Sequence, residues 1–212
     1  MEQRRLLSFG SARLSLAERL REALAAGHRR QPVLLPGDAL ELEEPGAGSM
    51  PAAVLVPVVE RPSPTVILTL RPETMRKHAG QISFPGGRID PGDDGPIAAA
   101  LREAEEEIGL SPAAVTVIGL ADRYRTITGF EVTPVVGVVP PDLPVRAQPG
   151  EVAAIFEAPL DFLLDPDNHR VRQAEWRGQQ RTYYEIMWGE RRIWGATAAM
   201  IVNLSRRLEL AP

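Results

Sequence analysis

The chain has 212 residues, 44% of them hydrophobic, which is enough to bury one sizeable core. Its formal net charge of −4 argues against a basic surface for nucleic acid or anionic lipid, and its lack of cysteine excludes disulfides and thiolate zinc sites. Because the N-terminus also lacks an apolar run of signal-peptide length, we expect a cytoplasmic protein that binds neither nucleic acid nor membranes.

The first predicted element is a helix that begins after Ser15. Ser15 and Glu18 have the spacing of a capping box, and Gly27 is expected to end the helix. Three leucines fall on one face of it: Leu16, Leu20 and Leu24. The following stretch, 31–51, is rich in proline, glycine and acidic residues, which is typical of a connector.

Two apolar runs then predict strands joined by a tight turn, at 53–59 and 65–70. Apolar residues at helical spacing predict a helix from Ile97 to Ile108, which Gly109 ends. Further strands are expected at 115–120, 132–139 and 152–156, a short helix at 159–164, a hairpin of 181–187 with 192–194, and a final helix at 196–208. This mixed order predicts an α/β (α+β) fold, in which helices cover both faces of a sheet.

The helix at 97–108 carries a stripe of carboxylates. Since residues three and four apart share a helix face, Glu103, Glu106 and Glu107 project from one side. Like charges at these spacings repel by about 0.2–0.5 kcal/mol per pair, so the stripe favours a bound cation. Carboxylate oxygens suit Mg²⁺ or Mn²⁺, the ions of phosphoanhydride hydrolysis. For the cluster alone, a solvated acidic face balanced by Arg102 is the alternative.

A pair of glycines precedes this helix, in the segment Phe84-Pro85-Gly86-Gly87-Arg88. Glycines let the backbone pass close to a ligand, and a loop that enters a helix can present amide donors to an anion. Alone, the pair predicts only a turn. Joined to the acidic stripe, it predicts a module with both phosphate access and metal ligands.

These residues resemble the signature of the Nudix hydrolases, with matches at Gly87, Asp93, Arg102, Glu103, Ala104, Glu106, Glu107, Gly109 and Leu110. Asp93 stands where the family usually has glutamate, and eight residues rather than seven separate it from Arg102. The resemblance implies an α/β/α sandwich around a mixed central sheet, and a hydrolase that uses Mg²⁺ or Mn²⁺.

Both departures are similar to what the coenzyme A branch of that family shows. Segments 68–71 and 75–87 look like that branch's second signature, and further likeness lies in 128–137 and 193–197. The resemblance spans about residues 52–207, and we divide the chain into an N-terminal helix and connector (1–50) and a hydrolase domain (51–212). It implies cleavage of CoA or its derivatives to 3′,5′-ADP and 4′-phosphopantetheine.

The pattern assigns three kinds of residue to a site. The candidate metal ligands are Glu103, Glu106 and Glu107. The candidate catalytic residues, which orient those ligands or activate water, are Arg102, Glu103, Glu106 and Glu151. The candidate substrate contacts, which are cationic or lie in the glycine loop, are Arg71, Arg76, Lys77, His78, Gly86, Gly87 and Arg88.

Several alternatives stay open. Arg76 and Lys77 could be ordinary solvated charges, and Glu151 a plain strand-end glutamate. Thr128-Gly129-Phe130 either forms a loop near the substrate or serves as turn and core. The small-molecule substrate could be ADP-ribose or NADH instead of CoA, or the chain could be a regulator that binds nucleotides without cleaving them. The N-terminal helix either packs on the hydrolase domain or contributes to a partner subunit in a homodimer.

Overall fold

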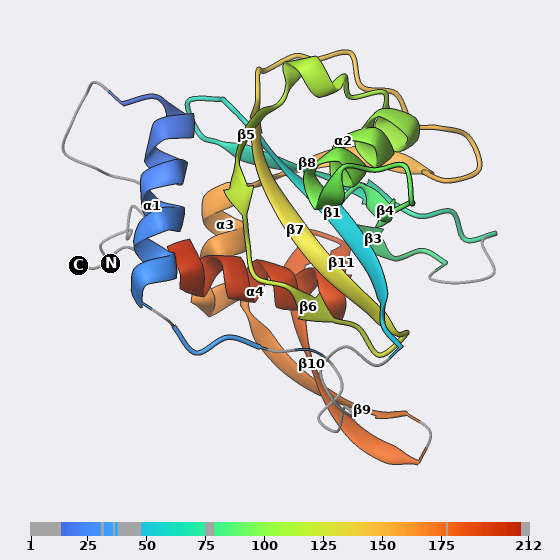
Figure 1. Cartoon of the computed structure of the whole chain (residues 1–212). Coiled ribbons are helices and arrows are strands. Elements are labelled where there is room, and N and C mark those ends of the chain that lie inside the picture. The colour runs from blue at the N-terminus through green and yellow to red at the C-terminus, as the bar shows by residue number, and fades with distance from the viewer. Residues whose placement is uncertain are drawn as a thin grey trace.

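The computed structural model describes residues 14–30, 32–35, 37, 48–74, 79–176 and 178–208. A large twisted sheet runs through the middle, helices lie on both of its sides, and a second sheet projects from one end (Figure 1). Within these ranges no helix has the length and apolar character needed to cross a membrane.

The large sheet has eight strands, and its main path is β3-β2-β1-β7-β5, with β4 beside β1, β6 beside β7 and β8 beside β2. The strands are β1 (Met50–Val59), β2 (Thr65–Leu70), β3 (Ile82–Ser83), β4 (Gly86–Arg88), β5 (Thr116–Leu120), β6 (Tyr124–Arg125), β7 (Phe130–Val139) and β8 (Ala154–Pro159). Among the strands of the described ranges, β1 and β7 form the parallel ladder, from Met50 beside Phe130 to Val59 beside Val139. The mixed sheet is as predicted.

Helices cover both faces of this sheet, which confirms the sandwich. The helices are α1 (Leu16–Arg30), α2 (Gly95–Ile108), α3 (Leu160–Leu164) and α4 (Ala196–Leu208), with short 3₁₀ turns at Pro112–Ala114 and Pro166–Asn168. The α2 helix packs on one face through a core that includes Ala100, Ala104 and Ile108. The other three pack on the opposite face, around a core that includes Leu20, Leu163 and Ile201. Two apolar layers therefore hold the β-sheet rigid between them.

The N-terminal helix begins as predicted but runs further. Glu18 accepts hydrogen bonds from the Ser15 backbone N–H and hydroxyl, both at 2.8 Å, so the capping box is present. The prediction that Gly27 ends the helix is wrong, because α1 continues to Arg30. Gly27 instead permits a close helix contact, since a β-carbon there would lie 1.8 Å from the carbonyl oxygen of Arg207 on α4.

The second sheet contains the predicted hairpin, β10 (Gln179–Trp188) with β11 (Arg191–Trp194). A third strand, β9 (Arg170–Trp176), pairs with β10 and was not predicted. Its residues from Arg170 to Glu175 are exposed, so the strand lacks the apolar alternation that marks a half-buried one. The strand expected at 152–156 also lies later in the chain, at 154–159.

Candidate active site

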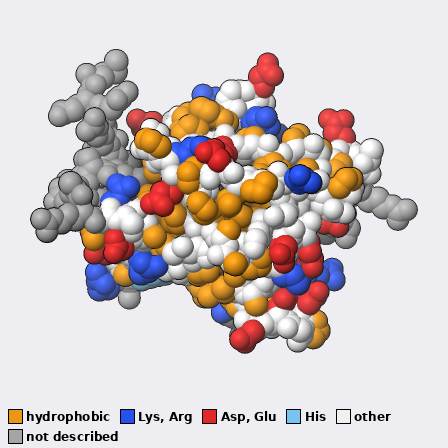
Figure 2. Space-filling model, turned by 90° about the horizontal axis from the view of Figure 1, so that it is seen from above, with side chains coloured by type: hydrophobic (Ala, Val, Ile, Leu, Met, Phe, Trp, Pro, Cys, Tyr) orange, Lys and Arg blue, Asp and Glu red, His pale blue; other side chains and the backbone are white. Residues whose placement is uncertain are grey.

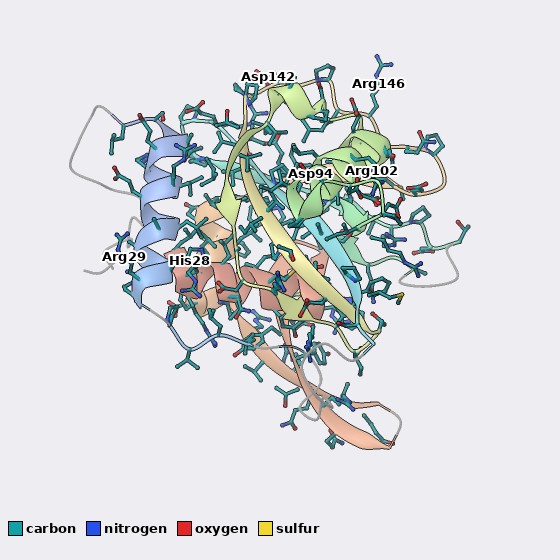
Figure 3. The ribbon with its side chains drawn as sticks, viewed as in Figure 1. His28, Arg29, Asp94, Arg102, Asp142 and Arg146 are labelled. Carbon is teal, nitrogen blue, oxygen red and sulfur yellow. The ribbon has the colours of Figure 1, made fainter. Side chains whose placement is uncertain are left out.

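The α2 helix has defined ends and one buried face, and together these decide where its carboxylates lie. Pro96 lies in the first turn, and Gly109 ends the helix in the left-handed region with φ 65°. The inner face is buried against β1 and β7 by small and apolar side chains, among them Ala99, Ala100 and Ala104. The charged face is therefore turned away from the core, and Figure 3 shows Arg102 on it.

Arg102 is the centre of an ion-pair network. It contacts the carboxylates of Asp93, Glu103 and Glu106 at 2.9, 3.0 and 3.0 Å, and donates to the Arg88 carbonyl at 3.1 Å. Two parallel hydrogen bonds from Arg102 hold Asp93, and they lower the pKa of that carboxyl below its usual range. Asp93 thus anchors Arg102, which accounts for an acidic residue at the position where the sequence pattern departs from its usual form.

Glu107 lies at the inner edge of the same helix in a different setting. It is only 5% exposed, and its carboxylate accepts a 3.2 Å hydrogen bond from the Gly86 backbone N–H. Burial raises the pKa of Glu107 to about 7; the Gly86 hydrogen bond and Arg71 oppose this rise, while Glu103 and Glu151 add to it. Three carboxylates therefore act on one another here, with Arg71 as the neighbouring cation.

The glycine loop is pressed against these carboxylates. A β-carbon at Gly87 would lie 2.6 Å from the Glu103 carboxylate, and one at Gly86 would lie 2.4 Å from the Ala53 carbonyl oxygen. Burial also raises the pKa of Glu103, and its hydrogen bond from Arg102 opposes this rise. Fixed backbone therefore excludes a side chain at Gly86, whereas a side chain at Gly87 would force the Glu103 carboxylate to move.

Glu151 reaches this region through backbone contacts that no local pattern predicts. The Gln148 backbone N–H donates to the Glu107 carbonyl, and the Arg146 N–H to the Ile108 carbonyl, both at 2.8 Å. The loop before β8 is thereby tied to the end of α2. Its exposed Glu151 is close enough to influence the pKa of Glu107.

The proposed substrate cations lie on two sides of the loop. Arg71 directly follows β2, is half-buried, and has a buried Nε with no hydrogen-bond acceptor. Arg88 ends β4 and is exposed, and no carboxylate in the described part of the chain pairs with it. Arg76, Lys77 and His78 lie outside the described residues.

The donor set fits a divalent cation, although it is not gathered into a finished metal site. No three acidic or histidine side chains of the described ranges are arranged to hold one ion, since Glu106 turns to Arg102 and Glu107 to the loop. The donors are all carboxylate oxygens, as Mg²⁺ and Mn²⁺ prefer. Glu107 is moreover buried with no cationic hydrogen-bond partner among the described residues, and a bound cation would compensate that charge.

Comparison with known proteins finds similar sequences and structures. A model of the NUDIX domain matches residues 49–180. The chain is 47% identical over 161 residues to a protein of Cronobacter sakazakii named "Uncharacterized Nudix hydrolase NudL", covering 76% of this chain and 84% of that one. The protein of the same name from Escherichia coli K12 is 45% identical over the same shares. A Caenorhabditis elegans Ap4A hydrolase structure overlaps with a TM-score of 0.46 and 20% identity, covering 52% of this chain and 80% of that one.

Proposed function

The chain belongs to the Nudix hydrolase family, and on that premise we propose that it hydrolyses the diphosphate of coenzyme A or its derivatives to 3′,5′-ADP and 4′-phosphopantetheine. Hydrolysis of a diphosphate with a divalent metal ion follows from the family. The observation that carries the reaction is the buried Glu107, held under the Gly86-Gly87 loop beside Glu103. The CoA assignment is supported by the sequence around that loop.

We assign Glu103, Glu106 and Glu107 to hold the metal. When bound, a divalent cation neutralises phosphate charge and makes a coordinated water more acidic. Arg102 orients Glu103 and Glu106 through its ion pairs. Protein contacts therefore hold Glu103 and Glu106 on the helix that carries Glu107, although the three carboxylates are not gathered around one point.

The phosphate groups would lie between the loop and its two flanking cations. Arg71 and Arg88 are suited to bind phosphate oxygens because neither has a carboxylate partner within the described ranges. Arg76, Lys77 and His78 remain proposed contacts from the sequence. Gly86 and Gly87 stay proposed contacts from the sequence, although the Gly86 N–H already donates to Glu107.

Glu151 is our preferred acceptor for the proton of the attacking water. It projects from the loop before β8 and is exposed, whereas Glu103 and Glu106 are hydrogen-bonded to Arg102. No cation among the described residues pairs with Glu151, so its carboxylate oxygens are available to accept a proton. Glu103 and Glu106 stay as the alternatives, and a Glu151→Gln variant that retains full kcat would favour them.

Product analysis tests this function. The purified chain is incubated with Mg²⁺ or Mn²⁺ and, in separate reactions, CoA, ADP-ribose or NADH. We expect 3′,5′-ADP to appear from CoA faster than either other substrate is cleaved. Faster cleavage of ADP-ribose or NADH would contradict the CoA assignment, and binding of CoA with no cleavage of any substrate would favour a regulator.

Two broader features remain proposals. The division at residue 50 separates α1 from the sheet in sequence, yet Leu16, Leu20 and Leu24 belong to the same core as α4. Deletion of residues 1–50 would therefore expose an apolar face on the rest of the chain.

The partner is proposed to be a small CoA-like diphosphate. A mass measurement in solution would decide between a monomer and a homodimer.

A further inference from the structure

Two phenylalanine side chains of the large sheet carry an arginine over the ring, but at different distances. The Arg191 guanidinium carbon lies 3.8 Å from the ring centroid of Phe156, which places the two groups in contact. The Arg88 guanidinium carbon lies 5.7 Å from the ring centroid of Phe130. Arg191 thus stacks directly on the Phe156 ring. Arg88 lies near the distance limit of a cation–π interaction with Phe130.

Phe130 is held firmly although its ring is only half-buried. Its backbone pairs with Met50 at the start of the β1–β7 ladder, and its N–H donates to the Thr126 hydroxyl at 3.0 Å. The turn before it is closed by Gly129, which lies in the left-handed region with φ 86° and donates to the Thr126 carbonyl. A fixed aromatic ring at the end of a strand loses little freedom when a flat ligand stacks on it.

Strand alternation places this ring on the same face of the sheet as Arg88, which directly follows Gly87 of the candidate site. Gly87 faces α2, where Glu103 lies against it. Successive side chains of a strand point to opposite faces, so Arg88 projects to the other face of the sheet. The row that includes Arg88 also contains Ala52 and Val132, and Phe130 lies on that same face two residues before Val132. A ligand at the glycine loop could thus continue over the edge of β4 to Phe130.

Arg88 is prepared to bind an anion at this edge. Its carbonyl is held by Arg102, while its exposed guanidinium has no carboxylate partner among the residues the structure describes. On the face of the molecule that Figure 2 shows, by contrast, acidic and basic side chains are interspersed. A cation without such a partner, next to a diphosphate site, is suited to a phosphate of the ligand.

We propose that Phe130 and Arg88 form a platform for the adenine nucleotide half of the substrate, with the base stacked on Phe130 and Arg88 on a phosphate of the same half. The platform rests on the proposed function only in requiring a substrate that contains adenosine diphosphate. The pantetheine half fits less well, because it is a flexible chain without a flat ring and has no charge beyond its phosphate. The base has the π-face, and the nucleotide has the additional anion.

Calorimetric titrations of the full chain with Mg²⁺ test the platform, using ADP, 3′,5′-ADP and 4′-phosphopantetheine as separate ligands. Phe130→Leu removes the ring, and Phe130→Trp restores a stacking surface. Phe156→Leu is the matched control, because the Phe156 ring is already covered by Arg191. We expect Phe130→Leu to weaken both nucleotides about tenfold and to leave 4′-phosphopantetheine unchanged. Phe130→Trp should recover the affinity, and Phe156→Leu should stay within twofold of the unaltered chain.

Steady-state kinetics should agree, with Phe130→Leu raising KM and largely retaining kcat. The platform is overturned if the unaltered chain binds neither nucleotide, if Phe130→Leu leaves nucleotide affinity intact, or if it weakens 4′-phosphopantetheine equally. Thermal unfolding of each variant identifies any general loss of structure. Cleavage of ADP-ribose in place of CoA would reject the CoA assignment alone, because the ADP titration applies to either substrate.

Discussion

The acidic helix α2 builds two carboxylate clusters that differ in how their charge is balanced. Around Arg102, one guanidinium satisfies Asp93, Glu103 and Glu106 at contact distances near the surface. Around Glu107, buried carboxylate charge is met by a backbone N–H and by the more distant Arg71. Among the described residues, Arg102 balances the first cluster through ion pairs, whereas Glu107 has no comparable ion pair. Glutamates a few positions apart on one helix thus differ in how their charge is balanced, although we propose that Glu103, Glu106 and Glu107 all bind the metal.

The largest effect is expected from Glu107→Gln, which removes the buried charge but keeps an acceptor for the Gly86 N–H. We expect kcat to fall about 1,000-fold, because an interaction at the reacting phosphate is lost. The thermal midpoint should stay unchanged or rise, because a buried charge without a cationic partner has been removed. Glu105→Gln is the matched control on the exposed side of the same helix. A large loss of stability with retained activity would mean that Glu107 has a structural role and no part in the reaction.

Gly87→Ala should be nearly as damaging. The added methyl would collide with the Glu103 carboxylate at 2.6 Å, so either the loop or the carboxylate must move. A displacement of about 1 Å at a reacting centre costs on the order of 100-fold in rate. Gly92→Ala, where no atom lies within 4 Å of the added carbon, should leave kcat within about twofold of the unaltered chain. Equal kcat values for the two variants would show that contact between loop and carboxylate is unimportant.

Arg102→Gln removes the guanidinium that pairs with Asp93, Glu103 and Glu106. We expect kcat to fall about 10-fold, since the ligands lose their orientation, and the free energy of unfolding to fall by about 1–3 kcal/mol. Urea unfolding and steady-state rates measure the two effects. Arg146→Gln, at the arginine beyond the end of α2 labelled in Figure 3, is the control and should change neither. Loss of activity without loss of stability would contradict the role of Arg102 as a structural anchor.

The smallest effect concerns pH. Arg102 lowers the pKa of Asp93 below its ordinary value of 3.8, so the ionised carboxylate stabilises the folded state above that pH. This contribution is lost as the pH falls through the lowered pKa of the folded state. We therefore expect the difference in urea midpoint between the unaltered chain and Asp93→Asn to be constant from about pH 7 to 5 and to shrink below about pH 4. A difference that persists at low pH would mean that Asp93 acts through packing alone.

Much of the fold could be predicted from local patterns. The final helix lies at 196–208 as expected, and the glutamate stripe on α2 follows from helical periodicity with Gly109 at its end. Strand β2 likewise has its predicted bounds. In each case the signal lies within a few consecutive residues, because capping, periodicity and turn formation are interactions between neighbours in the chain.

Contacts between distant segments could be determined only by the tertiary structure. Gly27 lies within α1, where it permits the close approach of Arg207 from far along the chain, and β9 forms by pairing with β10. The sequence made Glu106 and Glu107 equivalent members of one stripe. The structure exposes one to Arg102 and buries the other beneath Gly86. Periodicity fixes the side of a helix on which a carboxylate lies, but its pKa depends on the loops that cover it, and those are brought there by folding.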